Sequence, residues 1–501
     1  MIIVAGTALR MQNFTDPWTS DHRGWSGSYY GNIARNYVEH GYIETKFGAV
    51  ENVAPNDSSE FKYYVNHPPL LGLLISVSFR IFGISEWAVR LVPLLASVIS
   101  LLLVFLIARK LWNTTIALYA LLIFAVVPMG SFYGTLADVQ GPVVLLFCLL
   151  TVYFYLQFRD NPSLSNIALM CTALTLGALT DWPAFYLPPL MILHYYLWQP
   201  NAARSRMIFL PLLIVLMLGA AYLPYSNWLI GCEPFDLGRL QSNFSARSAG
   251  QFPDQPFSKA FTTSTWLARV LGQYWLVFLG YPIVFALALW TIVTLVHVIR
   301  ARSNASDGIY LLVLIFALMH ILIFRQGAYV HAYWSYYMLA PGSLAFGLCV
   351  KKSIDCIPLR HAHRTALAIV VLMPITAFSI FMLHHLWTHE SDSENKQIAL
   401  EINKRCSGKG LIVTDVFNKE PLYFYLKRPI VGVVLDKHKI AEIAKDTNVD
   451  YIFLSEAITQ NAALYARLVK ACPDCWRSKQ GTRCSGILIP RKTLAQALAK
   501  K

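Results

Sequence analysis

The stretch YYVNHPPLLGLL, residues 63–74, is the place where a long polar segment gives way to a series of apolar ones. Pro68 and Pro69 stiffen this entry because each proline ring holds its backbone φ near about −65°. Upstream, Asp21 lies in TSDHRGWSGSYYGNIARNYVEHGY, residues 19–42, which is too polar to cross a bilayer. A carboxylate on a polar loop before a rigid membrane entry predicts a site at the membrane surface, where a lipid-borne group meets a group in water.

Apolar residues dominate the chain. Of its 501 residues, 56% are hydrophobic and only 14% are charged, whereas soluble domains carry about 25% charged residues. The apolar runs recur along the chain and approach the length of about 20 residues that a helix needs to cross the hydrocarbon core. These features predict a polytopic membrane protein and exclude one large soluble core, which would not supply so many separate runs.

The apolar runs define the predicted spanning helices. Two short runs flank Asp181-Trp182-Pro183, which predicts a tight helical hairpin because proline disrupts a helix interior. Residues 68–83 form either a re-entrant or interfacial helix or a further span. Residues 1–14 are interpreted as the end of a helix that begins upstream, and no cleavable signal peptide is predicted. The expected total is about 11–13 spanning helices, ten of which lie near residues 85–108, 114–134, 139–158, 166–180, 184–198, 207–229, 275–299, 308–324, 332–350 and 365–387.

Positive charges are distributed unevenly between two sets of loops. One set holds 11 Lys and Arg in 47 residues, whereas the loop 15–67 holds 4 in 53. The positive-inside rule therefore places the first set in the cytoplasm; it comprises residues 109–113, 159–166, 199–207, 300–308 and 350–365. The loop 15–67, Asp138, Arg325 and everything after residue 388 are placed on the outer side. This topology accounts for much of the net charge of +14, and the dispersed basic residues predict no nucleic-acid partner.

The C-terminal segment, residues 388–501, has the pattern of a small extracytoplasmic α/β domain. Strands are predicted at GLIVTDVF, RPIVGVV and VDYIFLSE, and helices at KEPLYFYL and KHKIAEIAKDT. This alternation is typical of a mostly parallel sheet. No Gly-rich phosphate loop follows the first strand, so no motif supports nucleotide binding. The predicted domains are a transmembrane domain at 1–387, with a first outer loop at 15–67, and the α/β domain at 388–501.

Of the nine cysteines, three lie in the predicted spans, four lie in the tail, and Cys356 lies on a predicted inner loop. Cys148, Cys171 and Cys349 are interpreted as small core residues of the spans. For the tail, one or two structural disulfides are the leading interpretation, because the compartment is predicted to be oxidising. Free thiols, or a metal or redox site at the CPDC sequence, are the alternatives, and the pairing cannot be deduced from sequence. The tail cysteines are Cys406, Cys472, Cys475 and Cys484.

A set of motifs, densest in residues 15–160, resembles a known family. The motifs are Asp21, Ile33-Ala34-Arg35-Asn36-Tyr37, Gly41-Tyr42, His67-Pro68-Pro69-Leu70, Arg90-Leu91-Val92-Pro93 and Asp138. Together they resemble the protein O-mannosyltransferases and aminoarabinose transferases, which are membrane glycosyltransferases of the GT-C type in glycosyltransferase family 39 and its relatives. The resemblance covers roughly residues 1–350. It implies a polytopic all-α bundle of the GT-C type, a sugar donor on a polyprenyl phosphate, an active site at the outer leaflet, and the first-loop carboxylate as the base.

The chain also departs from that family. His22 follows Asp21 where the protein O-mannosyltransferases have Glu, and His67 stands where the aminoarabinose transferases have Lys. The tail replaces the β-trefoil domain of the eukaryotic enzymes. The acceptor therefore cannot be carried over from the resemblance.

The expected chemistry assigns roles to the candidate residues. A sugar on a polyprenyl phosphate already has a good leaving group, so the enzyme needs a base for the acceptor hydroxyl and positive donors for the departing phosphate. Asp21 fits the base, and Asp138 fits acceptor binding or help in proton transfer; for both, the alternative is a helix N-cap. The candidate donor-phosphate ligands are His67, Arg90, Arg325 and His331; membrane-edge cations also pair or snorkel without binding a ligand. No metal and no cofactor is predicted.

These assignments predict an inverting sugar transferase that uses a general base at the outer face of the plasma (inner) membrane. Its partners would be a polyprenyl-phosphate-linked sugar, a protein or glycolipid acceptor such as lipid A, and the lipid bilayer. One alternative is a transporter or flippase of lipid-linked saccharides, which would be expected to carry charged or broken helices at the bilayer midplane. Another is a scaffold without catalytic activity.

Overall fold

The computed structural model describes residues 1–199, 205–250, 261–358, 361–388, 394–406, 410–414, 420–432, 437–455, 470, 475–480 and 483–499. The chain forms two compact units. Unit 1 comprises Met1–Phe14, Val65–Leu74 and Trp87–His389, and unit 2 comprises Thr15–Tyr64, Ile75–Glu86 and Glu390–Lys501. The predicted first outer loop thus belongs to the same compact unit as the C-terminal segment. The two predicted domains, 1–387 and 388–501, stay a prediction.

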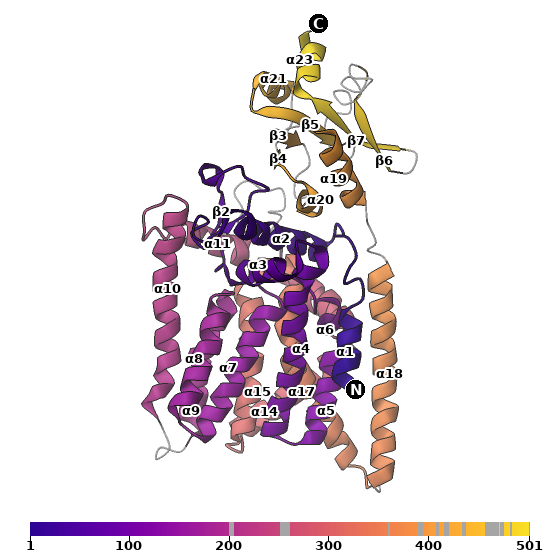
Figure 1. Ribbon diagram of the computed structural model, residues 1–501. Helices are drawn as coiled ribbons and strands as arrows, with labels where there is room; N and C mark the ends of the chain where they lie inside the picture. The colour runs from indigo at the N-terminus through magenta and orange to yellow at the C-terminus, as the bar shows by residue number, and fades with distance from the viewer. Residues whose placement is uncertain are drawn as a thin grey trace. The chain divides into compact units, whose positions relative to one another are not determined.

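Unit 1 is a helical bundle, as the apolar runs predict (Figure 1). In the described ranges, six helices are long and apolar enough to cross a membrane. They are α4 (Glu86–Leu111), α7 (Pro142–Asp160), α10 (Leu210–Leu229) with the short turn before it, α14 (Tyr281–Ile299), α15 (Ala305–Ile323) and α18 (His361–Thr388). The prediction of an all-α membrane bundle with a small C-terminal α/β region is confirmed.

The other predicted spans are shorter or broken, and prolines or tight turns mark most of the breaks. The 114–134 run is α5 (Thr114–Val126) followed by α6 (Pro128–Phe132), because Pro128 cannot continue the first helix. The two short runs are α8 (Leu164–Ala178) and α9 (Leu187–Trp198), separated by the 3₁₀ turn η2 (Trp182–Tyr186). Residues 332–350 begin as the 3₁₀ segment η6 (Ala332–Met338) and continue as α17 (Leu339–Asp355).

A buried arginine, Arg10, caps the C-terminal end of α5. Arg10, on α1 (Ile2–Arg10), is 1% exposed and donates to the carbonyls of Phe124 and Ala125, both at 2.9 Å. Its Nε also donates to Ser97 Oγ at 2.7 Å. The last carbonyls of a helix have no intrahelical partner, so a cation with several donors is a suitable cap there. Arg10 is therefore a structural residue of the bundle, which the sequence did not single out.

Close helix packing in unit 1 depends on small residues. α5 and α17 run side by side, and a Cβ added at Gly347 would lie 2.8 Å from the carbonyl oxygen of Ile116. Backbones approach this closely in membrane bundles where small residues line the contact. A rigid bundle of this kind fixes the turns at its ends, which carry the polar residues described below.

The C-terminal part of unit 2 is a three-layer α/β fold (Figure 1). Its strand order is β4-β3-β5-β7-β6, with β3 parallel to β4 and β5, and β7 antiparallel to β5 and β6. The sheet is therefore mixed, and the prediction of a mostly parallel sheet is wrong because two C-terminal strands were not recognised. The strands are β3 (Leu411–Thr414), β4 (Ile430–Gly432), β5 (Val449–Ser455), β6 (Trp476–Gln480) and β7 (Arg483–Pro490).

Helices cover both faces of this sheet. α21 (Lys437–Lys445) and α23 (Arg491–Ala499) bury Ile440, Ile443 and Leu494 against one face. α19 (Glu394–Arg405) and α20 (Glu420–Tyr425) bury Ile402 and Leu422 against the other. Cys406 is a buried free thiol in this second core. Cys472 and the side chain of Cys484 lie outside the described residues, so a disulfide among Cys472, Cys475 and Cys484 stays a prediction.

The first loop joins this fold through α2 (His22–His40). Arg35 of α2 lies over the ring of Phe424 and donates to the carbonyls of Phe424 and Leu426 at the end of α20. The backbone N–H of Trp18 donates to the hydroxyl of Tyr425 at 2.8 Å. The segment that carries Asp21 is thereby packed against the C-terminal segment within one compact unit.

Candidate active site

Asp21 is the N-cap of α2. Its carboxylate accepts the backbone N–H of Gly24 at 3.0 Å and the Arg23 Nε–H at 3.1 Å, and it also accepts the hydroxyl of Thr19. Burial raises the pKa of Asp21, but the charge of Arg23 and these hydrogen bonds outweigh it, so the pKa lies below its usual value. Asp21 is therefore ionised at neutral pH and can accept a proton, although as a weak base.

The turn that holds Asp21 requires a glycine. A Cβ at Gly24 would lie 1.9 Å from the carbonyl oxygen of Thr19, a distance that no side chain tolerates. Gly27, on the next turn of α2, is likewise in contact with the ring of Trp18. The sequence TSDHRGWSG therefore folds into a cap in which the chain before Asp21 lies directly on the first turns of α2.

His67 lies in the rigid entry before α3 (Leu70–Phe82), and its side chain is paired. Nδ1 of His67 lies 2.6 Å from Oδ1 of Asp181, whose side chain is completely buried. Asp181 precedes η2 but makes no cap bond to it, so its carboxylate serves His67 instead of the helix end. The pair joins two segments that are 114 residues apart in sequence.

Side chains from three different elements hold the backbone around His67 by hydrogen bonds. The Tyr222 hydroxyl donates to the carbonyls of Val65 at 3.1 Å and of His67 at 2.7 Å. The indole N–H of Trp182 donates to the Asn66 carbonyl at 2.9 Å, and Arg239 donates to the Val65 carbonyl at 3.0 Å. These contacts come from η2, α10 and α11 (Gly238–Ala249), so the bundle fixes where the His67 side chain begins.

Two further buried polar side chains stand beside the pair. His320 on α15 is 1% exposed and lies within electrostatic reach of His67 and Asp181. The ring centroid of His320 lies 5.3 Å from that of Tyr337. The Tyr337 hydroxyl interacts electrostatically with the carboxylates of Asp181 and Asp138. We call this set the buried polar cluster; its members are His67, Asp138, Asp181, His320 and Tyr337.

The buried polar cluster is incompletely hydrogen-bonded. Among the residues that the structure describes, Oδ2 of Asp181, both ring nitrogens of His320 and the Tyr337 hydroxyl have no hydrogen-bond partner. Buried polar groups in folded proteins are almost always paired, because an unpaired one costs about 1–3 kcal/mol. Several such atoms in one buried region of the bundle are the arrangement expected of a binding site that is complete only with its ligand.

Asp138 enters the cluster from a turn. It is 5% exposed, and its carboxylate accepts the backbone N–H of Gln140 at 3.0 Å. α7 begins only at Pro142, with Gly141 as its N-cap, so the expectation that Asp138 opens or caps this helix is wrong. The proline at the first helical position and the turn before it move the carboxylate away from the helix end.

The remaining predicted phosphate ligands have other neighbours. Arg90 on α4 donates to the Phe14 carbonyl at 2.9 Å. Arg325, which begins α16 (Arg325–Val330), donates to Thr263 Oγ1 at 3.0 Å and lies over the rings of Phe261 and Trp266. His331 follows α16, and its ring stacks on Trp334, which in turn lies 4.7 Å from His320 between ring centroids. His331 thus reaches the edge of the cluster through Trp334.

The sequence missed three members of the cluster. The sequence predicts a hairpin turn at Asp181, a span at His320 and an interfacial aromatic residue at Tyr337, with stacking on a sugar as the alternative for Tyr337. The signal for two of them was present, because an ionisable residue inside an apolar run is costly and is usually functional. Tyr337 carried no comparable signal, since aromatic residues are common at membrane interfaces. Across the described ranges, no three His, Cys, Asp or Glu side chains form a metal-binding group, and the expectation of no metal stays a prediction.

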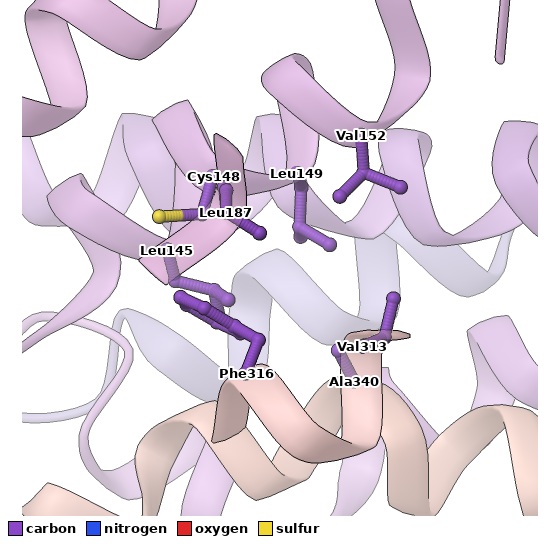
Figure 2. Close-up of a pocket in the computed structure, with 8 residues that line it drawn as sticks. All are labelled: Leu145, Cys148, Leu149, Val152, Leu187, Val313, Phe316 and Ala340. Carbon is purple, nitrogen blue, oxygen red and sulfur yellow. The ribbon is translucent and has the colours of Figure 1, made fainter. Parts of the chain in front are cut away.

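A small cavity also lies in the bundle of unit 1 (Figure 2). The lining comes from α7, α9, α15 and α17 and is apolar apart from one thiol; the residues are Leu145, Cys148, Leu149, Val152, Leu187, Val313, Phe316 and Ala340. The space is about one water molecule in size. Such a cavity is a packing defect and does not fit a sugar or a lipid head group.

Comparison with known proteins finds a family that part of this chain resembles. The model of the family described as dolichyl-phosphate-mannose-protein mannosyltransferase matches residues 66–225, which include His67, Asp138, Asp181 and Tyr222. ArnT from Cupriavidus metallidurans, in a crystal structure bound to undecaprenyl phosphate, has the same fold: the TM-score is 0.66 at 14% identity, over 99% of this chain and 98% of that chain. The chain has the GT-C fold, and part of it resembles glycosyltransferase family 39.

Other proteins show the same likeness. The undecaprenyl phosphate-alpha-4-amino-4-deoxy-L-arabinose arabinosyl transferase 2 of Pseudomonas fluorescens is 28% identical over 177 residues, which is 34% of this chain and 32% of that protein. The Archaeoglobus fulgidus oligosaccharyltransferase shares the fold with a TM-score of 0.60 at 12% identity, over 93% of this chain and 70% of that one. The chain therefore matches about a third of the length of its curated relatives by sequence. With its six long apolar helices it is a multi-pass integral membrane protein.

Proposed function

We propose that this chain transfers a sugar from a polyprenyl-phosphate carrier to an acceptor hydroxyl at the outer face of the membrane. The observation that carries the proposal is the buried polar cluster, which holds unpaired hydrogen-bonding atoms inside a bundle of the GT-C fold. Two relatives support the choice of donor: the ArnT structure is bound to undecaprenyl phosphate, and the P. fluorescens protein is named for an undecaprenyl-phosphate-linked sugar.

The proposed reaction is a single displacement. The bond between the sugar C1 and the phosphate oxygen breaks, and the phosphate leaves with the electron pair. A bond forms between C1 and the acceptor oxygen, and Asp21 takes the proton that the acceptor hydroxyl loses. Attack opposite the leaving group inverts the configuration at C1. In the proposed site His67 donates to the phosphate, since a charge-assisted hydrogen bond to the leaving group is strong and stabilises it as charge develops.

The other candidate residues have supporting roles in this proposal. Asp138 contributes to acceptor binding or proton transfer from the edge of the cluster. Arg325 and His331, at the two ends of α16, and Arg90 on α4 are further candidate phosphate ligands. The proposed acceptor is a protein, for which the matching family is named, and a glycolipid is the alternative; the name of the P. fluorescens relative gives its sugar and carrier but no acceptor.

Mass spectrometry of the lipid that copurifies with the chain after gentle extraction tests the proposal. A polyprenyl phosphate or its glycosylated form is expected in the wild-type preparation. Transfer of the labelled sugar from that lipid to water-soluble and lipid acceptors then distinguishes a transferase from a flippase, because a flippase would move the lipid across vesicles without cleaving it. A copurifying lipid without a phosphate, or movement without cleavage, would contradict the proposal.

A further inference from the structure

Asp181 has no role in the proposed reaction, although it is among the most buried carboxylates of unit 1. Its backbone N–H donates to the Gly177 carbonyl at 2.9 Å at the end of α8, which fixes its place in the turn. The side chain is 0% exposed, and Oδ1 is occupied by His67 whereas Oδ2 has no partner among the described residues. Buried side-chain oxygens are paired in the large majority of cases, so an unpaired Oδ2 is unusual for a carboxylate that serves only packing.

Rotation of the His67 ring about its side-chain bonds is the one movement that Asp181 can restrict. The chain on both sides of His67 is fixed by Tyr222, Trp182 and the following Pro68, so the ring can change only by rotation about its side-chain bonds. The His67 side chain is 16% exposed, so its Nδ1 edge faces the buried carboxylate while part of the ring remains accessible. The hydrogen bond made by one ring nitrogen sets the protonation and direction of the other.

We propose that Asp181 is the positioning residue for His67: by accepting the Nδ1–H, it holds the ring so that Nε2–H is directed at the lipid-borne phosphate. This inference rests on the proposed function, in which His67 contacts that phosphate. Between a carboxylate and a phosphate, the ring donates one N–H to each. Asp181 itself does not touch the donor.

A double-mutant cycle on binding of undecaprenyl phosphate tests the proposal. The four proteins are the wild type, Asp181→Asn, His67→Ala and the double variant, each as the full chain in detergent with its melting temperature recorded. His67→Ala is expected to weaken binding by about 10–100-fold, and Asp181→Asn by about 10-fold. The double variant should bind as His67→Ala does, within about twofold, because Asp181 acts only through His67. Asp160→Asn, in a carboxylate paired with Lys110, is the matched control and should bind as the wild type.

The possible results separate the two claims. If Asp181→Asn weakens binding equally with and without His67, Asp181 acts independently, and the positioning role is overturned while the proposed function stands. If His67→Ala binds as the wild type does, His67 is no phosphate ligand, and both its part in the proposed function and the positioning role fail.

A second pair of variants covers the case in which Asp181→Asn does not fold. The side-chain amide nitrogen of Asn occupies roughly the place of Nδ1, and that of Gln roughly the place of Nε2. His67→Gln should therefore bind undecaprenyl phosphate about 3–10-fold more tightly than His67→Asn, because only Gln keeps the donor on the phosphate side. The opposite order would overturn the proposal.

Discussion

Asp21 and Asp181 are both carboxylates at the residue before a helix, and they differ in what holds them. All hydrogen-bond partners described for the Asp21 carboxylate, Thr19, Arg23 and Gly24, lie within three residues of it. Asp181 is held by His67, which lies 114 residues away, and keeps one unpaired oxygen. The first is a local motif that is complete by itself, whereas the second exists only in the folded bundle and leaves one carboxylate oxygen unsatisfied.

This difference separates two tasks of the proposed enzyme. A base must stay ionised and in place whatever the donor does, and the local bonds that lower the pKa of Asp21 achieve this. A leaving-group site must exchange hydrogen bonds with its ligand, and unpaired atoms in a buried polar cluster provide them. Two properties of the Asp21 turn can therefore be tested: whether local contacts alone position the carboxylate, and on which side of the membrane the turn lies.

If local contacts position Asp21, a single substitution in its turn should displace the carboxylate. In Gly24→Ala the new Cβ would lie 1.9 Å from the Thr19 carbonyl oxygen, so the turn must open and move the carboxylate. A misplacement of about 1 Å costs up to about 10²-fold in rate, and we expect a loss of about 10–100-fold in sugar transfer with donor binding retained. The comparison is steady-state transfer against Gly272→Ala, where an added Cβ meets nothing within 4 Å. Equal rates in the two variants would show that the cap does not position Asp21.

The C-terminal segment should make the stability of unit 2 pH-dependent. Burial and the nearby charge of Glu51 raise the pKa of Glu420 from 4.5 to about 7. Because the folded-state pKa is the higher one, this contribution to stability is fully present below pH 4.5 and is lost as the pH rises through 7. We expect the wild type to lose about 2 kcal/mol between pH 5 and 7.5 that Glu420→Gln does not lose.

Thermal unfolding of the full chain at the two pH values, followed by tryptophan fluorescence, measures this difference. Glu442→Gln, an exposed glutamate paired with Lys439, is the control and should keep the wild-type pH dependence. A Glu420→Gln variant that follows the wild type at both pH values would contradict the assignment.

A smaller effect should follow from the hydroxyl that joins the first loop to the C-terminal segment. The Tyr425 hydroxyl accepts the Trp18 N–H at 2.8 Å and donates to Glu86 Oε1 at 3.0 Å. Tyr425→Phe should lower the free energy of unfolding by about 1–2 kcal/mol, because it removes two hydrogen bonds. Tyr451→Phe, whose hydroxyl bond to the Arg405 carbonyl is 3.5 Å long, should cost less. Chemical denaturation of both variants decides the order.

Labelling of two natural cysteines tests on which side of the membrane the loop that carries Asp21 lies. No effect on activity is expected. Cys232 and Cys356 are exposed, and the charge distribution places them on the outer and the cytoplasmic side respectively. In variants whose single remaining cysteine is Cys232 or Cys356, an impermeant thiol reagent should label Cys232 in intact cells and Cys356 only after permeabilisation. The reverse pattern would place the active site in the cytoplasm.

The fold was predictable because it follows from long, strongly patterned segments. The apolar runs predicted the helices of the bundle, and the strand GLIVTDVF and helix KHKIAEIAKDT appear as β3 and α21. Breaks inside runs were harder to predict: Pro128 ends α5, but the 3₁₀ start of residues 332–350 has no proline before it. β7 was missed because its sequence RCSGILIP is part polar and part apolar, and its pairing with β5 decides its structure.

The candidate site divides in the same way. The Asp21 cap was visible as an N-cap alternative in the sequence, because its partners are neighbours. The pairing of His67 with Asp181 and the approach of His320 and Tyr337 depend on how four distant segments meet, which no local pattern encodes.

The most direct test of the account compares Asp21→Asn with the wild type in two separate assays, sugar transfer from the polyprenyl-phosphate donor and binding of undecaprenyl phosphate. Asn keeps the size of the side chain but is a poor proton acceptor, so transfer should fall by about 10²–10⁴-fold while binding stays within about threefold. Asp57→Asn, at another carboxylate that caps a short helical turn in the same loop, is the control and should transfer at the wild-type rate. Transfer at the wild-type rate by a well-folded Asp21→Asn protein would contradict the account and make Asp138 the next base to test.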